Sequence, residues 1–234
     1  MPNYKDESAG HTMSMSLEVI ELESGKNPTA SLIVLHGLGA DGSDFVPVAQ
    51  ELNLDPIGEA RFIFPHAPVM PVTINGGMSM RAWYDILGTD LAKREDERGL
   101  RASQAMIEAL IARECERGID AARIVLMGFS QGCAMTLMTG LRYGQRLAGL
   151  VGLSGYLPLA AVTEAERHTA NGDVPIFLAH GSADQVIPIA RATASRDALK
   201  AMGHPVEWHE YPMPHSVCAE EIADLNRWLL KTLA

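Results

Sequence analysis

Continuous apolar runs alternate with stretches of helical period along most of this chain, and that alternation restricts the folds open to it. Runs such as SLIVL (31–35) and RIVLM (123–127) are apolar at nearly every position. A strand with one face in water alternates apolar and polar residues, so unbroken runs indicate strands that are covered on both faces. The pattern predicts an α/β fold with a doubly wound, mostly parallel sheet and helices on both of its faces.

The predicted strands are the short runs at residues 17–22, 31–35, 61–64, 123–127, 147–153, 174–179 and 206–211. The last run alternates, so it is expected nearer an edge of the sheet. The predicted helices are residues 44–52, 94–117, 132–143, 189–202 and 218–232. Residues 65–90 fit neither pattern and are expected to form a long irregular loop of the kind that is often functional. We expect one domain over residues 17–234, preceded by a flexible extension at residues 1–16.

Residues 128–132 (GFSQG) match the pattern G-x-S-x-G, which is common by itself but lies here in an informative context. An apolar strand ends immediately before the pattern and a helical pattern begins immediately after it. A sharp turn from strand to helix leaves the hydroxyl of Ser130 exposed and strains its backbone, and the glycines allow neighbouring backbone to approach. The context favours a nucleophile over a serine that only caps the helix.

A serine hydroxyl needs a positioned base, usually a histidine that is held by a carboxylate. In this kind of fold the acid and then the histidine follow the serine along the chain. Of the histidines after Ser130, only His215 lies in a loop between the last predicted strand and the last helix, whereas His209 falls inside that strand. Functional residues gather beyond the carboxyl ends of the strands. The same rule selects Asp184, which follows a strand, over Asp173, which precedes it.

The segment HGLG (36–39) follows a predicted strand. It is glycine-rich, like the loops that supply one backbone N–H group to an oxyanion hole. The expected oxyanion donors are the backbone N–H groups of Leu38 and Gln131, and a plain strand–loop junction is the alternative. His36, Asp41 and Asp44 are conceivable metal ligands, but nothing else in the sequence completes their coordination. We therefore expect neither a metal nor a cofactor.

The net charge, the cysteine spacing and the apolar segments of the sequence bear on which partners and which location are expected. The chain has a net charge of −10 and no run rich in Lys or Arg, so nucleic acid and anionic membrane surfaces are not expected partners. Its three cysteines show no zinc or redox spacing. No secretory h-region and no long apolar window is found. These features predict a cytoplasmic protein without integral membrane association.

Taken together, these segments resemble the phospholipase/carboxylesterase family of serine α/β-hydrolases, which includes bacterial carboxylesterases, acyl-protein thioesterases and lysophospholipases. The matching segments, in the family's order, are LHGLGADGSDF, RFIFPHAP, AWYD, GFSQGCAM, HGSADQVIP and PHS. The resemblance implies an α/β-hydrolase fold, a triad of Ser130, Asp184 and His215, and an oxyanion hole at Leu38 and Gln131. Many members are weak dimers, which leaves a weak homodimer open.

The resemblance also implies that residues 78–85 lie beside the active site. The connection over residues 157–175 is too short for a cap domain, so the acyl groove is expected to be built from loops. Trp83, Met78 and Met80 are candidate groove residues, because aromatic side chains and flexible methionines accept varied apolar chains. Core packing explains any one of these three residues equally well.

The predicted function is hydrolysis of short- to medium-chain carboxylic esters through an acyl-enzyme, with a small-molecule or lipid ester as the substrate. An acyl-protein thioesterase or a lysophospholipase that uses the same triad is the nearest alternative. An alternative from another class is a non-catalytic α/β-hydrolase scaffold that binds an apolar ligand.

Overall fold

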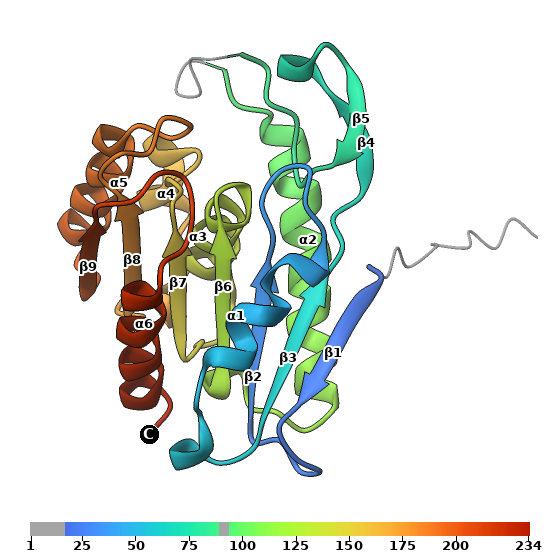
Figure 1. Cartoon of the computed structure of the whole chain (residues 1–234), viewed down its shortest axis with the longest axis vertical. Helices are drawn as coiled ribbons and strands as arrows, with labels where there is room; N and C mark the ends of the chain where they lie inside the picture. Colours follow the sequence, from blue (N-terminus) through green and yellow to red (C-terminus); the bar gives the residue numbers. More distant parts are fainter. Residues whose placement is uncertain (1–16, 89–93) are drawn as a thin grey trace, which may run out of the picture.

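The computed structural model describes residues 17–88 and 94–234, so the expected extension at residues 1–16 lies outside the described residues. Its centre is a seven-stranded sheet in the order β1-β3-β2-β6-β7-β8-β9 (Figure 1). These strands are β1 Val19–Glu23, β2 Ala30–Leu35, β3 Ala60–Pro65, β6 Ile124–Phe129, β7 Gly149–Leu153, β8 Ile176–Gly181 and β9 Val206–Tyr211. β1 pairs with β3 in the antiparallel direction, and the other neighbouring strands pair in parallel. The mostly parallel sheet is confirmed, with β9 at an edge as expected.

Helices cover both faces of this sheet (Figure 1). They are α1 Val46–Glu51, α2 Glu97–Glu116, α3 Gln131–Arg142, α4 Ala160–Glu166, α5 Ile189–Ala201 and α6 Ala219–Thr232. α1 and α6 pack on one face, where Phe45, Leu225 and Trp228 are part of one buried cluster. α2 and α3 pack on the other face, where the buried cluster includes Ile107 and Leu137. The doubly wound fold is therefore confirmed.

Two regions differ from the sequence-based expectation. The stretch expected to be wholly irregular contains an antiparallel hairpin of β4 Val69–Val72 and β5 Met78–Arg81. Its strands have only four residues each, and one contains Pro71, so neither shows a readable alternation. Between β7 and β8 the chain forms α4, which was not expected, and a short 3₁₀ turn. The described residues form no cap domain.

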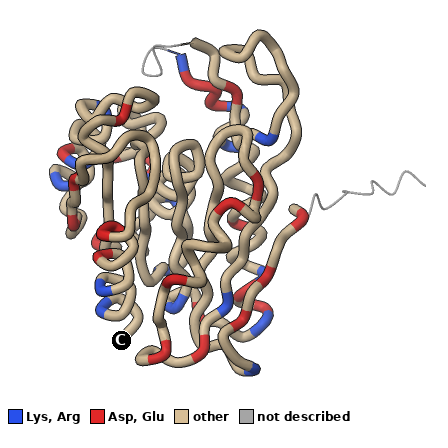
Figure 2. The backbone as a smooth tube through the Cα atoms, viewed as in Figure 1, with Lys and Arg blue, Asp and Glu red and all other residues tan. Residues whose placement is uncertain are grey.

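The parallel register places the ends of the central strands at one edge of the sheet. Leu35 of β2 lies opposite Gly128 of β6, and Phe129 lies opposite Leu153 of β7. The loops that follow β2, β6, β8 and β9 therefore leave the sheet side by side. Figure 2 shows most charged residues on the outer helices and the lower loops, away from these central strand ends. None of the helices in the described ranges is long and apolar enough to cross a membrane.

Glu221, in the first turn of α6, gives a prediction about the pH dependence of stability. Its side chain is fully buried, and burial raises the pKa of its carboxyl group to about 8. Because an unfolded Glu titrates at about pH 4.3, the unfolded chain releases this proton at a lower pH than the folded chain does. The free energy of unfolding should therefore fall by about 1.4 kcal/mol per pH unit as the pH rises between these two values.

We expect Glu221→Gln to flatten this fall, because an amide carries no proton to release. Urea denaturation at pH 5 and pH 8 measures the difference. The matched control is Glu220→Gln, which changes an exposed neighbour in the same helical turn. An equal pH dependence in the wild type and in Glu221→Gln would contradict the prediction.

Candidate active site

Ser130 lies at the sharp turn between β6 and α3, as expected from the sequence. Its φ of 56° and ψ of −115° place a non-glycine residue in a sparsely populated conformation, which the surrounding structure must hold. The backbone N–H of Ser130 donates to the carbonyl of Leu153 at 2.9 Å, which ties the turn to the neighbouring strand β7.

The two glycines of the motif are required by close backbone contacts. A Cβ on Gly132 would lie 2.1 Å from the carbonyl oxygen of Leu35, and a Cβ on Gly128 would lie 2.2 Å from the carbonyl carbon of Gly132. α3 therefore begins directly against the end of β2 and the end of β6. This contact sets Ser130 beside the loop that follows β2.

His215 lies in the loop between β9 and α6 and contacts both other residues of the predicted triad. Its Nε2 is 2.9 Å from Ser130 Oγ, and its Nδ1 is 2.7 Å from Asp184 Oδ2. The ring of Phe129 packs against the imidazole with centroids 4.7 Å apart. With the proton on Nδ1 donated to the carboxylate, Nε2 is free to accept the serine proton. The structure thus brings together three residues that are up to 85 positions apart.

Asp184 follows β8, and its carboxylate is fixed from both sides. Oδ1 accepts the backbone N–H groups of Val186 at 2.8 Å and Ile187 at 2.9 Å, which leaves Oδ2 facing His215. His180 Nε2 donates to the carbonyl of Ile187 at 2.8 Å and lies 3.4 Å from Asp184 Oδ2. The carboxylate side chain has no exposed surface, so these contacts determine its orientation.

The predicted oxyanion residues line the same cavity as Ser130. Leu38 lies in the loop after β2, and Gln131 is the first residue of α3. The side chain of Gln131 accepts the N–H of Trp83 at 2.8 Å and donates to the carbonyl of Tyr84 at 2.7 Å. The amide side chain therefore joins the start of α3 to the segment after β5. The oxyanion role of the two backbone N–H groups stays a prediction.

His36 holds the loop that contains Leu38. Its Nε2 accepts the N–H of Ala67 at 3.0 Å, so its Nδ1 carries the proton and donates to the carbonyl of Gly37 at 2.7 Å. Burial lowers the pKa of the His36 imidazole, which keeps the ring neutral and able to accept. Both ring nitrogens are engaged. Across the described ranges, no group of three or more His, Cys, Asp or Glu side chains is placed to hold a metal ion.

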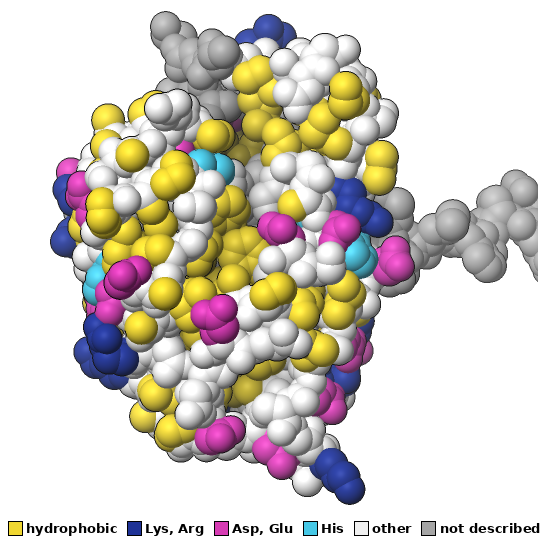
Figure 3. Space-filling model, in the orientation of Figure 1, with side chains coloured by type: hydrophobic (Ala, Val, Ile, Leu, Met, Phe, Trp, Pro, Cys, Tyr) yellow, Lys and Arg dark blue, Asp and Glu magenta, His cyan; other side chains and the backbone are white. Residues whose placement is uncertain are grey.

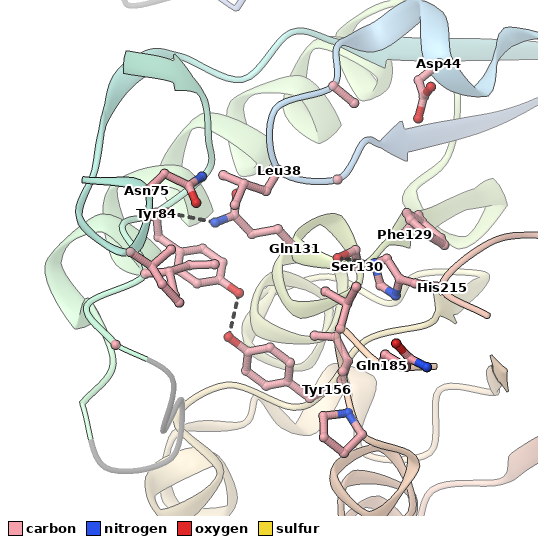
Figure 4. Close-up of a pocket in the computed structure, with 18 residues that line it drawn as sticks. Leu38, Asp44, Asn75, Tyr84, Phe129, Ser130, Gln131, Tyr156, Gln185 and His215 are labelled. Atoms are coloured by element: carbon pink, nitrogen blue, oxygen red, sulfur yellow. Dashed lines mark hydrogen bonds between the residues drawn. The ribbon is translucent and has the colours of Figure 1, made fainter. Parts of the chain in front are cut away.

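A cavity of about 700 Å³ opens at Ser130 and His215. Figure 3 shows hydrophobic side chains around a hollow in this face, and Figure 4 shows the lining residues. The apolar and aromatic part of the lining includes Leu38, Ile74, Tyr84, Ile86, Tyr156 and Ile187. These residues come from loops, as expected for a groove without a cap domain.

The three residues named in advance for the groove do not line this cavity. Trp83 is 1% exposed, and its Nε1 donates to the carbonyl of His36 at 3.0 Å, so it is a core residue. Met78 and Met80 lie on the hairpin strand β5, where Met78 is 65% exposed. The residue after Trp83, Tyr84, lines the cavity instead. Tyr156 and Ile187, which follow β7 and β8, were missed, although the rule that selected Asp184 also applies to them.

We expect Trp83→Ala to lower the free energy of unfolding by about 3–5 kcal/mol, because it leaves a large cavity in the core. The ratio of kcat/KM between short and medium acyl chains should change little. Ile86→Ala is the matched control, because Ile86 lines the cavity and should change that ratio more than stability. Urea denaturation and ester kinetics on both variants test the assignment. A large change in the ratio with unchanged stability in Trp83→Ala would contradict it.

Comparison with known proteins decides the family. A model of the phospholipase/carboxylesterase family matches residues 16–233. The chain belongs to this family. It is therefore a serine hydrolase of the α/β-hydrolase fold, which sets aside the non-catalytic scaffold that the sequence left open.

Individual members of the family are similar over most of the chain. Acyl-protein thioesterase 1 of Yarrowia lipolytica is 42% identical over 206 residues, which cover 86% of this chain and 91% of the relative. The crystal structure of Arabidopsis thaliana SOBER1 is 28% identical with a TM-score of 0.83, covering 88% of this chain and 99% of that one. The crystal structure of Zea mays acyl-protein thioesterase 2 is also 28% identical, with a TM-score of 0.81 and coverage of 93% and 100%.

Proposed function

We propose that this hydrolase cleaves short- to medium-chain carboxylic esters through an acyl-enzyme on Ser130. The observation that carries the proposal is the hydrogen-bonded chain from Ser130 Oγ to His215 and on to Asp184. Ser130 and His215 line a largely apolar cavity, which suits an acyl group.

In the proposed mechanism, Ser130 Oγ attacks the acyl carbonyl carbon while His215 Nε2 takes the hydroxyl proton. The oxyanion that forms is stabilised by the N–H groups of Leu38 and Gln131. When the C–O or C–S bond breaks, His215 gives its proton to the leaving alcohol or thiol. Water then attacks the acyl-enzyme in the same way and releases the carboxylic acid. Asp184 keeps the imidazole in the tautomer that can accept at Nε2.

Thioester hydrolysis on acylated proteins is the second candidate function. It is favoured by the 42% identity to a protein named acyl-protein thioesterase 1. The triad mechanism serves both bonds, because His215 can protonate a leaving alkoxide, and a leaving thiolate is a weaker base that depends less on this protonation. The cavity that receives the acyl chain therefore discriminates between substrates more than the triad does.

A turnover panel tests the proposal. It compares carboxylic esters of increasing acyl length, a long-chain lysophospholipid and an S-acylated peptide, each with and without pretreatment by a fluorophosphonate. We expect the esters and the thioester to be cleaved, with the highest kcat/KM at short to medium chain lengths, and pretreatment to abolish turnover. A strong preference for the lysophospholipid would contradict the proposed substrate. The cytoplasmic location and the weak homodimer stay predictions.

A further inference from the structure

Two tyrosine hydroxyls meet at one end of the apolar cavity. Tyr84 follows β5, and Tyr156 follows β7; both residues line the cavity and are 3% exposed. Their hydroxyl oxygens lie 2.7 Å apart, and either can be the donor (Figure 4). A buried polar pair at the end of an apolar cavity costs free energy unless its hydrogen bonds are satisfied.

The two hydroxyls have one more hydrogen-bond donor than their mutual hydrogen bond uses. Two hydroxyls supply two O–H donors, and their mutual hydrogen bond uses one of them. In the described part of the chain, the second O–H has no other side-chain or backbone acceptor. Burial raises the pKa of Tyr84 and of Tyr156, so both hydroxyls keep their protons at neutral pH. One donor is therefore left for whatever occupies the cavity.

A guanidinium group lies over one ring of this pair. The Cζ atom of Arg191, in the first turn of α5, lies 3.8 Å from the ring centroid of Tyr156. The Nε of Arg191 is buried without a hydrogen-bond partner, and among the described residues the Glu95 carboxylate interacts with its guanidinium electrostatically without forming an ion pair. The guanidinium is attracted to the ring face, and its positive charge also attracts an electron-rich oxygen at this end of the cavity. The end of the cavity therefore favours an oxygen that accepts hydrogen bonds.

The position of the pair identifies the part of the substrate that it would meet. In Figure 4, Tyr84 and Tyr156 lie on the opposite side of Ser130 from His215 and Phe129. His215 must protonate the leaving group, so the leaving group lies on the His215 side of Ser130. The acyl group then extends towards the tyrosines.

We propose that the hydroxyl pair of Tyr84 and Tyr156 is an acyl-recognition subsite, which selects acyl groups that end in a hydrogen-bond acceptor oxygen over plain alkyl chains. This inference rests on the proposed function, because it assumes an acyl-enzyme on Ser130. The substrate class is esters or thioesters of oxygenated short- to medium-chain acids. A site built to donate to a substrate oxygen rejects the analogue that lacks it, because the buried donor is then left unpaired.

The experiment uses nitrophenyl esters in matched sets of butanoyl, hexanoyl and octanoyl chains. Each set contains a methyl-ended chain, its ω-hydroxy analogue and the half-ester of the matching dicarboxylic acid. At the chain length that reaches the tyrosines, we expect an oxygen-ended ester to have a kcat/KM about tenfold above the methyl-ended one. The faster of the two oxygen-ended esters identifies whether the acceptor is a hydroxyl or a carboxylate.

The double variant Tyr84→Phe/Tyr156→Phe removes both hydroxyls and keeps both rings, so it leaves no hydroxyl unpaired. Its ratio of oxygen-ended to methyl-ended kcat/KM should fall to about one. Tyr211→Phe is the matched control, since it removes a hydroxyl that donates to Asp224 outside the cavity, and it should keep the wild-type ratio.

Three results would overturn the inference, and they are distinguishable. If the wild type cleaves all esters through Ser130 with no preference at any chain length, the subsite is wrong and the proposed function stands. If the wild type cleaves none of the esters, the proposed function and the subsite both fail. A double variant that keeps the wild-type ratio would also contradict the subsite.

Discussion

Ser130→Ala should lower kcat for ester hydrolysis by a factor on the order of 10⁶ and abolish labelling by a fluorophosphonate. The expected loss is this large because Oγ is the atom that we propose forms the acyl-enzyme, and the remaining groups cannot replace it. Single-turnover kinetics with a nitrophenyl ester and mass spectrometry of the labelled protein measure the two effects. The wild type should gain one label, and the variant none.

The matched control is Ser154→Ala. Ser154 is also a buried serine with a positive φ, of 49°, and it follows the neighbouring strand β7. It does not line the cavity, so its replacement should leave turnover and labelling close to the wild type. The thermal midpoints of both variants show whether the fold is intact. A folded Ser130→Ala protein that keeps the wild-type kcat would refute the assignment of the nucleophile.

The sequence predicted the sheet well because each central strand is covered on both faces. Such strands read as unbroken apolar runs, and their ends then mark where functional residues emerge. His215 was chosen over His209 because it follows the last predicted strand, whereas His209 falls inside that strand. The structure gives a physical reason why His209 is not free to act as the base. His209 Nε2 lies 2.9 Å from Glu207, and its Nδ1 lies 3.2 Å from Asp224, so its ring nitrogens face carboxylates on β9 and α6.

The lining of the cavity could not be predicted in the same way. Trp83 and Tyr84 are adjacent and follow the short strand β5, without a periodic pattern that would assign a side to each. Trp83 reaches the carbonyl of His36, whereas Tyr84 meets Tyr156, which is 72 positions away. Helix α4 was missed for a similar reason, because it has only seven residues and shows no clear apolar stripe. Both features depend on tertiary contacts rather than on local sequence.

Asp184→Asn should lower kcat by a factor on the order of 10⁴ while the protein stays folded. The contacts of Asp184 explain why an isosteric amide is so damaging. Oδ1 accepts two backbone N–H groups, from Val186 and Ile187, so in the variant the amide oxygen takes this position. The amide nitrogen then faces His215, where the wild type has the Oδ2 acceptor.

An amide N–H that donates to Nδ1 of His215 holds the imidazole proton on Nε2, and Nε2 can no longer accept the proton of Ser130. The matched control is Asp173→Asn, which makes the same chemical change at an exposed ion pair with Arg146 and should leave kcat unchanged. Steady-state kinetics and urea denaturation of both variants separate lost activity from lost stability. If Asp184→Asn keeps more than about a tenth of the wild-type kcat, the carboxylate does not set the tautomer of His215, and another group must orient the base.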